Sequence, residues 1–99
     1  MIDAPSLEAV IYRALAALNA ERPASDQLAL APATRLFGPG ARLDSLGLVS
    51  LISDVETTLV TEHGMDVSLA DDRALARAES PYATVATLRD YVLELARGA

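Results

Sequence analysis

The stretch GPGARLDSLGLVSLISDVE, residues 38–56, passes from a glycine-containing loop into a long apolar run. From there the apolar residues recur with helical spacing, at Val49, Ile52, Leu59 and Val60. The pattern predicts a helix from Ser45 to about His63, with Val49, Ile52 and Leu59 in the core and Gly64 as the C-terminal stop. It also raises the question of what a serine does at the start of this helix.

An amphipathic helix is expected before the loop, over residues 6–21, because its apolar residues recur every three or four positions. Ser6, or Asp3 upstream, can cap its first amides, and Pro23 would stop it. Residues 22–44 contain three prolines and two glycines, which exclude a long regular element. This segment is nevertheless expected to be ordered, because apolar side chains can anchor it: Leu28, Leu30, Leu36 and Phe37.

Two more helices are expected after Gly64. Within residues 66–79, Val67 is a candidate core anchor and Ser68 a candidate cap. The charge order that follows suits the dipole of a short helix, with acids first and arginines later: Asp71, Asp72, Arg73 and Arg77. Ser80-Pro81 would break that helix, and Thr84 would cap a last one. The fold class expected is all-α, a four-helix bundle with a long ordered loop between the first two helices and a short third helix.

The composition limits the classes of protein to which the chain can belong. Its 99 residues are expected to form one domain, residues 1–99. A net charge of −6 argues against a nucleic-acid partner, which requires a positive surface. No apolar stretch is long enough for a membrane span, and no signal peptide is recognisable, so we expect a cytoplasmic monomer. The absence of cysteine excludes disulfides and thiolate metal sites.

Ser45 could act as a nucleophile, as a helix cap or as an attachment point. A serine nucleophile needs a base within hydrogen-bonding reach, and the only histidine is His63. At about 1.5 Å rise per residue, the two would lie about 27 Å apart along the predicted helix. No Gly-x-Ser-x-Gly motif is present either, and no cluster of ligands has zinc-binding spacing. We therefore expect no catalytic residue and no metal site, which leaves a cap or an attachment point.

The region around this serine resembles the phosphopantetheine site of acyl carrier proteins. In that family an Asp-Ser-Leu tripeptide opens the second of four helices, with an apolar residue four positions past the serine and acids further along. The matching positions here are Asp44, Ser45, Leu46, Val49 and Glu56. The segment ATVATLRDYV, residues 83–92, is similar to the start of the family's last helix. The resemblance extends over most of the chain, in the same helix order.

The resemblance implies a carrier protein rather than an enzyme. A phosphopantetheinyl transferase would attach 4′-phosphopantetheine from coenzyme A to Ser45, and its thiol would hold acyl groups as thioesters for loading and processing enzymes. Asp44 would contact the transferase or help bind its metal, or it would cap the helix. Leu46 would be either an apolar partner contact or part of the core, Val49 could line a cleft for cargo, and Glu56 would help partners dock.

Two alternatives remain open from the sequence. The first is an aminoacyl or peptidyl carrier fed by an adenylating enzyme, and the second is a helical interaction module that is never modified. Many family members carry acids two and five positions beyond the serine, where this chain has Gly47 and Ser50. The less acidic surface suggests a specialised fatty-acid, polyketide or related biosynthetic pathway with dedicated partners.

Overall fold

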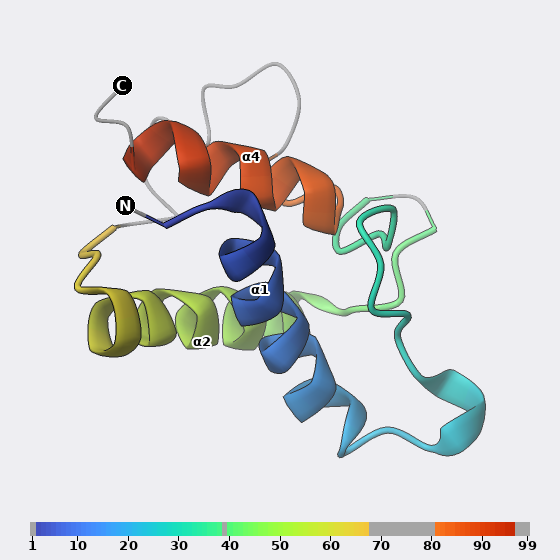
Figure 1. Ribbon diagram of the computed structural model, residues 1–99. Helices are drawn as coiled ribbons and strands as arrows, with labels where there is room; N and C mark the ends of the chain where they lie inside the picture. The colour runs from blue at the N-terminus through green and yellow to red at the C-terminus, as the bar shows by residue number, and fades with distance from the viewer. Residues whose placement is uncertain (1, 39, 68–80, 97–99) are drawn as a thin grey trace.

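The computed structural model describes residues 2–38, 40–67 and 81–96 and contains helices but no strand in these ranges (Figure 1). The helices are α1 (Ala4–Asn19), the 3-10 helix η1 (Ala24–Asp26), α2 (Ser45–His63) and α4 (Val85–Ala96). The prediction of an all-α fold is confirmed. The expected short helix within residues 66–79, with its cap and charge order at Ser68 to Arg77, lies almost entirely outside the described residues.

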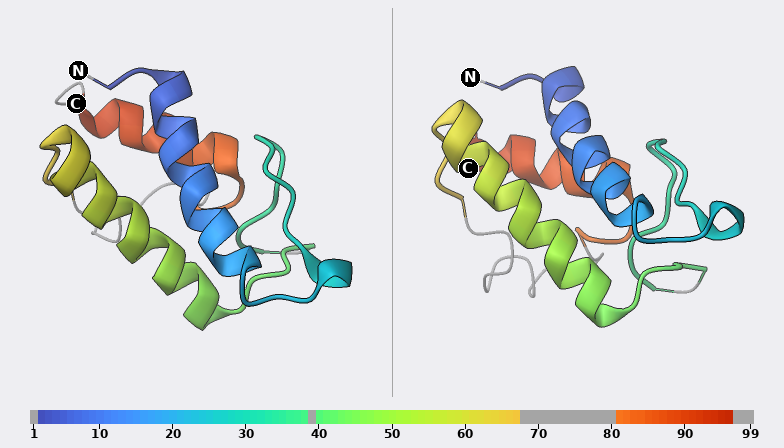
Figure 2. Two further views of the ribbon diagram at one scale, coloured as in Figure 1. Left: turned by 60° about the horizontal axis from the view of Figure 1, so that its bottom comes forward. Right: turned by 90° about the horizontal axis from the view of Figure 1, so that it is seen from below.

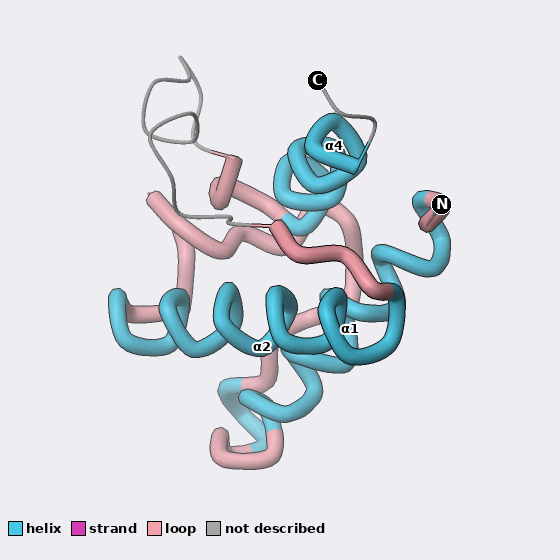
Figure 3. Tube along the Cα trace, turned by 90° about the vertical axis from the view of Figure 1, so that its left-hand side faces the viewer, coloured by secondary structure: helices cyan, strands magenta, loops and turns pink. Residues whose placement is uncertain are grey.

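The three α-helices surround one core. Figure 1 shows α2 and α4 running across opposite sides of the molecule, with α1 crossing between them. Helix α1 packs against both α2 and α4, and Figure 2 shows α1 and α2 side by side in two further views. Figure 3, which looks along α4, shows the loop after α2 turning back into the space between α2 and α4. Helix α1 therefore packs between the other two α-helices and contacts both.

The core is made mainly of aliphatic side chains from the three α-helices and from the long loop. The largest side chains that are fully buried are Leu7, Ile11, Leu15, Leu36, Leu51, Val55, Leu59, Val85, Leu88 and Val92. Ile52 and Leu59 are buried as predicted, and Val67 packs against the core from its edge. No polar or charged residue of the described ranges is buried, so hydrophobic burial is the main stabilising contribution.

Helix α1 begins two residues earlier than predicted and ends before Pro23. Of the two candidate caps, Asp3 is the N-cap: its Oδ1 accepts a hydrogen bond from the backbone N–H of Ser6 at 2.9 Å. Pro5 lies in the first turn, where a missing N–H costs nothing. The helix ends at Asn19, and the side chain of that residue bonds to the loop. Its Oδ1 accepts from Leu28 N at 2.7 Å and its Nδ2 donates to Leu28 O at 2.9 Å.

The long loop is ordered, as the sequence predicts, but only two of its four expected anchors are buried. Leu28 and Leu36 lie in the core, whereas Leu30 is 49% exposed and Phe37 is 50% exposed. The burial expected for Leu30 and Phe37 was wrong. Backbone hydrogen bonds supply the remaining order, since Leu36 N donates to Ala83 O at 2.8 Å. The loop is thus fixed against the start of α4.

The N-terminus of α4 depends on that loop. Its first two amides donate outside the helix, Val85 N to Thr34 O at 3.1 Å and Ala86 N to Pro32 O at 2.9 Å. Thr84 caps the helix as predicted, because its Oγ1 accepts from the N–H of Thr87 at 3.1 Å. The amides that a helix start leaves without intrahelical partners are therefore satisfied by the loop and the cap.

Asp3 is expected to make the stability depend on pH at the acid end of the range. Hydrogen bonds from the side chain and backbone N–H of Ser6 lower the pKa of Asp3 from its ordinary value of 3.8. Since the folded pKa lies below the unfolded one, the stabilisation is complete above the unfolded value and is lost as pH falls through the folded value. Urea unfolding at a series of pH values should show the advantage of the wild type over Asp3→Asn shrinking below about pH 4. An advantage that is constant at every pH would contradict this assignment.

Candidate functional site

The candidate site is the start of α2, where Asp44 and Ser45 have different structural positions. Asp44 has an extended backbone and is the N-cap; its Oδ1 accepts from Gly47 N at 2.7 Å. Ser45 is the first residue of α2. Asp44 and Ser45 were both candidates for capping α2, and the cap is Asp44. Helix capping therefore does not explain the serine. The contact of Asp44 with a transferase or its metal stays a prediction.

Gly47 fits closely beneath this cap. A Cβ added there would lie 3.1 Å from Leu43 Cδ2 and 3.2 Å from Asp44 Oδ1, tighter than ordinary van der Waals contact. An acidic residue at position 47 would also bring a second carboxylate near that of Asp44. Local packing at position 47 therefore favours glycine over the acidic residue that many acyl carrier proteins have there.

The first turns of α2 present apolar side chains to solvent. Leu46 is 77% exposed, so it is not a core residue, and its role as a partner contact stays a prediction. Val49 is 60% exposed, so its predicted place in the core was wrong. Helix α2 buries Leu48, Leu51 and Ile52 instead, which turns Leu46 and Val49 outward. Glu56 is partly buried two turns further along.

Ion pairs, as well as buried side chains, contribute to the order of the loop before the site. Asp26 in η1 accepts from Arg22 at 2.8 Å, and Arg42 lies 3.5 Å from its other oxygen. Arg42 lies three positions before Ser45, so these ion pairs link η1 to the chain just ahead of α2. The arginines of the loop, residues 22–44, also contrast with residues 45–67, which contain acids but no lysine or arginine.

An open groove of about 550 Å³ runs between α1 and α2 and reaches the start of α2 at Val49 and Ser50. Its other side is lined by Ala14, Ala17 and Leu18 of α1 and by Glu21 just beyond that helix, and none of these was among the site residues predicted from the sequence. The only signal there is the pair of small residues, the buried Ala14 and the exposed Ala17, a pattern that occurs in helices without any groove.

At the far end of α2, Gly64 ends the helix as predicted, with φ of 64°, and Met65 N donates to Leu59 O at 2.9 Å. His63 is exposed in the last turn, far along the helix from Ser45, as expected. Among the described residues, no group of three or more side chains could hold a metal ion. Within the same ranges, no helix has both the length and the apolar character needed to cross a bilayer.

Comparisons with known proteins found no match: no family model, no curated protein and no solved structure is significantly similar to this chain.

Proposed function

We propose that the chain is a carrier protein whose Ser45 receives 4′-phosphopantetheine and whose cofactor thiol then holds an acyl group as a thioester. It would present that group to partner enzymes and perform no catalysis itself. In the attachment step the serine oxygen bonds to the pantetheine phosphorus of coenzyme A, its proton is lost, and the adenosine bisphosphate part leaves. A phosphopantetheinyl transferase supplies the catalysis.

The observation that carries the proposal is the division of roles between Asp44 and Ser45. Because Asp44 caps α2 through Gly47 N, the serine is not needed as the cap. Ser45 begins the helix, where N–H groups lack intrahelical partners and the helix dipole is positive. A phosphodiester on Ser45 would carry its negative charge at that position, which favours anions.

The surroundings of Ser45 also suit presentation to other proteins. Leu46 and Val49 are exposed next to it, three positions apart on the same helix, and together they would give a partner enzyme an apolar contact beside the serine. The loop before it is held by Leu28, Leu36 and the ion pairs of Asp26. A phosphopantetheine arm attached to Ser45 would therefore be flexible along its length but anchored at one defined point, the start of α2.

The proposal includes the four-helix form of the carrier fold, with the short third helix in the segment outside the described residues. It also includes a specialised pathway, since Gly47 and Ser50 occupy positions that are acidic in many carriers. Elongation assays with fatty-acid synthase enzymes of general specificity test this part. Slow or absent turnover is expected, and efficient elongation would count against it.

Ser45→Ala is expected to abolish modification completely. The protein is incubated with coenzyme A and a transferase of broad specificity, and its intact mass is measured. The wild type should gain the mass of one phosphopantetheine, because only the hydroxyl of Ser45 lies at the tripeptide position.

Matched controls come from α2 itself. Ser50→Ala and Ser53→Ala remove exposed hydroxyls from the same helix and should leave the mass gain intact. A wild-type protein that stays unmodified, or a Ser45→Ala variant that is still modified, would reject the assignment and leave an unmodified helical module. Loading assays with acyl and aminoacyl donors then separate acyl from aminoacyl cargo.

A further inference from the structure

The groove between α1 and α2 has a physical cause in the sequence. Four of the residues that line it have short side chains, Ala14 and Ala17 on α1 and Ser50 and Ser53 on α2. Leu18 and Leu51 form the apolar floor below them. Side chains of this size do not fill the space between two helices, so a shallow channel stays open to solvent. It covers about two helical turns on each side.

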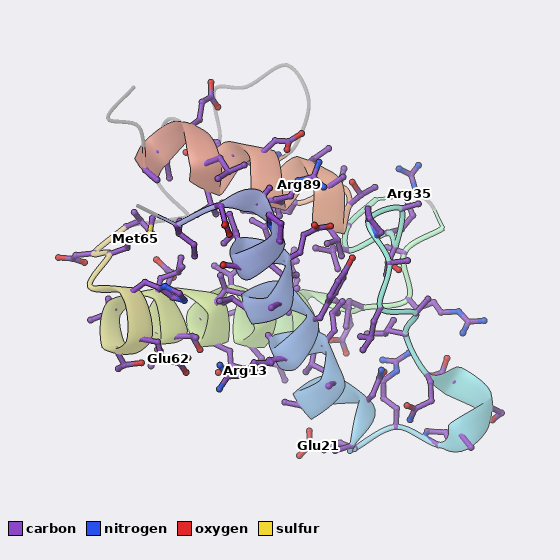
Figure 4. All side chains as sticks on the ribbon, viewed as in Figure 1. Arg13, Glu21, Arg35, Glu62, Met65 and Arg89 are labelled. Atoms are coloured by element: carbon purple, nitrogen blue, oxygen red, sulfur yellow. The ribbon has the colours of Figure 1, made fainter. Side chains whose placement is uncertain are left out.

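The charges around the groove are predominantly acidic. Glu21 and Asp54 line it, and neither forms an ion pair with another residue in the described part of the chain. The nearby cation is Arg13, which is paired with Glu62 at 2.9 Å. Figure 4 shows Arg13 and Glu62 together beside the α1–α2 crossing, with Glu21 at the lower end of α1. The hydrogen bond that Arg13 donates to Glu62 raises the pKa of Arg13, and the charge of Asp54 adds to this.

We propose that this α1–α2 groove binds a cationic amphipathic helix of a partner protein. The apolar face of that helix would cover the groove floor, and its lysine or arginine side chains would meet Glu21 and Asp54. Two turns of groove with small residues on both walls match the way an amphipathic helix lies in an apolar channel. The carboxylates of Glu21 and Asp54 at the rim favour a positive occupant.

Charge also decides against a second copy of the chain as the occupant. The chain has a net charge of −6, and the groove rim of one copy would face a predominantly acidic second copy. An acyl chain carries no charge to match the carboxylates, and a channel open along its length would leave such a chain in contact with water. The cationic helix is the occupant that both the apolar floor and the acidic rim favour.

The inference goes beyond the proposed function and is tested on the Ser45→Ala protein, so that its outcome does not depend on modification. The probe is a synthetic helical peptide with leucines at helical spacing and flanking arginines. A second peptide has glutamates in place of the arginines. Titration into isotope-labelled protein should shift amide resonances of residues 14–21 and 49–57 with the arginine peptide only. Added salt of about 0.5 M should weaken the binding, because it screens exposed charges.

Matched variants locate the contact. Ala17→Trp fills the groove and should abolish peptide binding, whereas Ala16→Trp, on an exposed neighbouring position outside the groove, should not change it. Removing both rim charges with Glu21→Gln and Asp54→Asn should weaken binding about fivefold, as expected for two exposed ion pairs. Asp66→Asn together with Asp90→Asn, which removes the same charge elsewhere, should have little effect.

Several results would overturn the proposal. No shifts at millimolar peptide, shifts centred outside the groove, or equal binding by Ala16→Trp and Ala17→Trp would each reject it. Self-association of the chain that Ala17→Trp abolishes would assign the groove to a second copy. Groove shifts on acyl loading of the wild type, without peptide binding, would assign it to the cargo. If Ser45 is modified but the peptide does not bind, only the groove proposal fails.

Discussion

Leu36→Ala is expected to destabilise the protein by about 3 kcal/mol, a typical loss for a fully buried leucine. Leu36 is 0% exposed, and it is the loop residue whose N–H also bonds to Ala83 O. Its side chain thus anchors the loop in the core while its backbone joins the loop to the residues just before α4. Shortening the side chain removes buried apolar area and leaves a cavity in the core.

Urea unfolding followed by circular dichroism measures this loss. Leu30→Ala is the matched control, because it makes the same chemical change in the same loop at a side chain that is 49% exposed. Its cost should stay below about 1 kcal/mol, since little apolar area is returned to water. Faster hydrogen exchange at Val85 and Ala86 is also expected in Leu36→Ala, because their acceptors lie in the loop. Equal losses for the two variants would show that the loop is not anchored as described.

Helix positions and stops were predictable because they follow from local chemistry. The periodicity of α1, α2 and α4, the cap at Thr84 and the stop at Gly64 each depend on residues within a turn or two. The same reasoning predicted an ordered loop, since residues 22–44 combine turn residues with leucines. Local signals therefore located the three α-helices that the structure describes, with α1 displaced by two residues from its predicted bounds.

The direction in which apolar residues point was less predictable. Leu46, Val49, Leu30 and Phe37 are as apolar as their buried neighbours, and hydropathy alone does not say which of them faces solvent. On α2 nearly every position between Ser45 and Ile52 is apolar or small, so no single stripe stands out. The choice depends on where α1 packs, which is a tertiary fact. For the same reason the sequence did not reveal the groove, which needs short side chains on two helices at once.

Asp44 is the residue for which capping and partner recognition can be separated. Asp44→Ala should destabilise α2 by about 1 kcal/mol, because Gly47 N loses its acceptor. Asp44→Asn keeps a side-chain oxygen of nearly the same geometry and should cost only a few tenths of that amount, since asparagine is an equally favourable cap. Urea unfolding of the two variants therefore measures the cap alone.

The rate of phosphopantetheine transfer to the same two variants then measures what the charge adds. If the carboxylate contacts the transferase or its metal, Asp44→Asn should be modified about tenfold more slowly although its stability is nearly unchanged, because a hydrogen bond to a charged group is lost. Asp66→Asn removes a carboxylate just beyond the far end of α2 and outside the α1–α2 groove, and it serves as the charge control. A normal rate for Asp44→Asn together with a reduced rate for Asp44→Ala would mean that the aspartate acts only by capping. In that case the start of α2 would depend on Asp44 for its shape, and the recognition by the transferase would have to come from other residues such as Leu46.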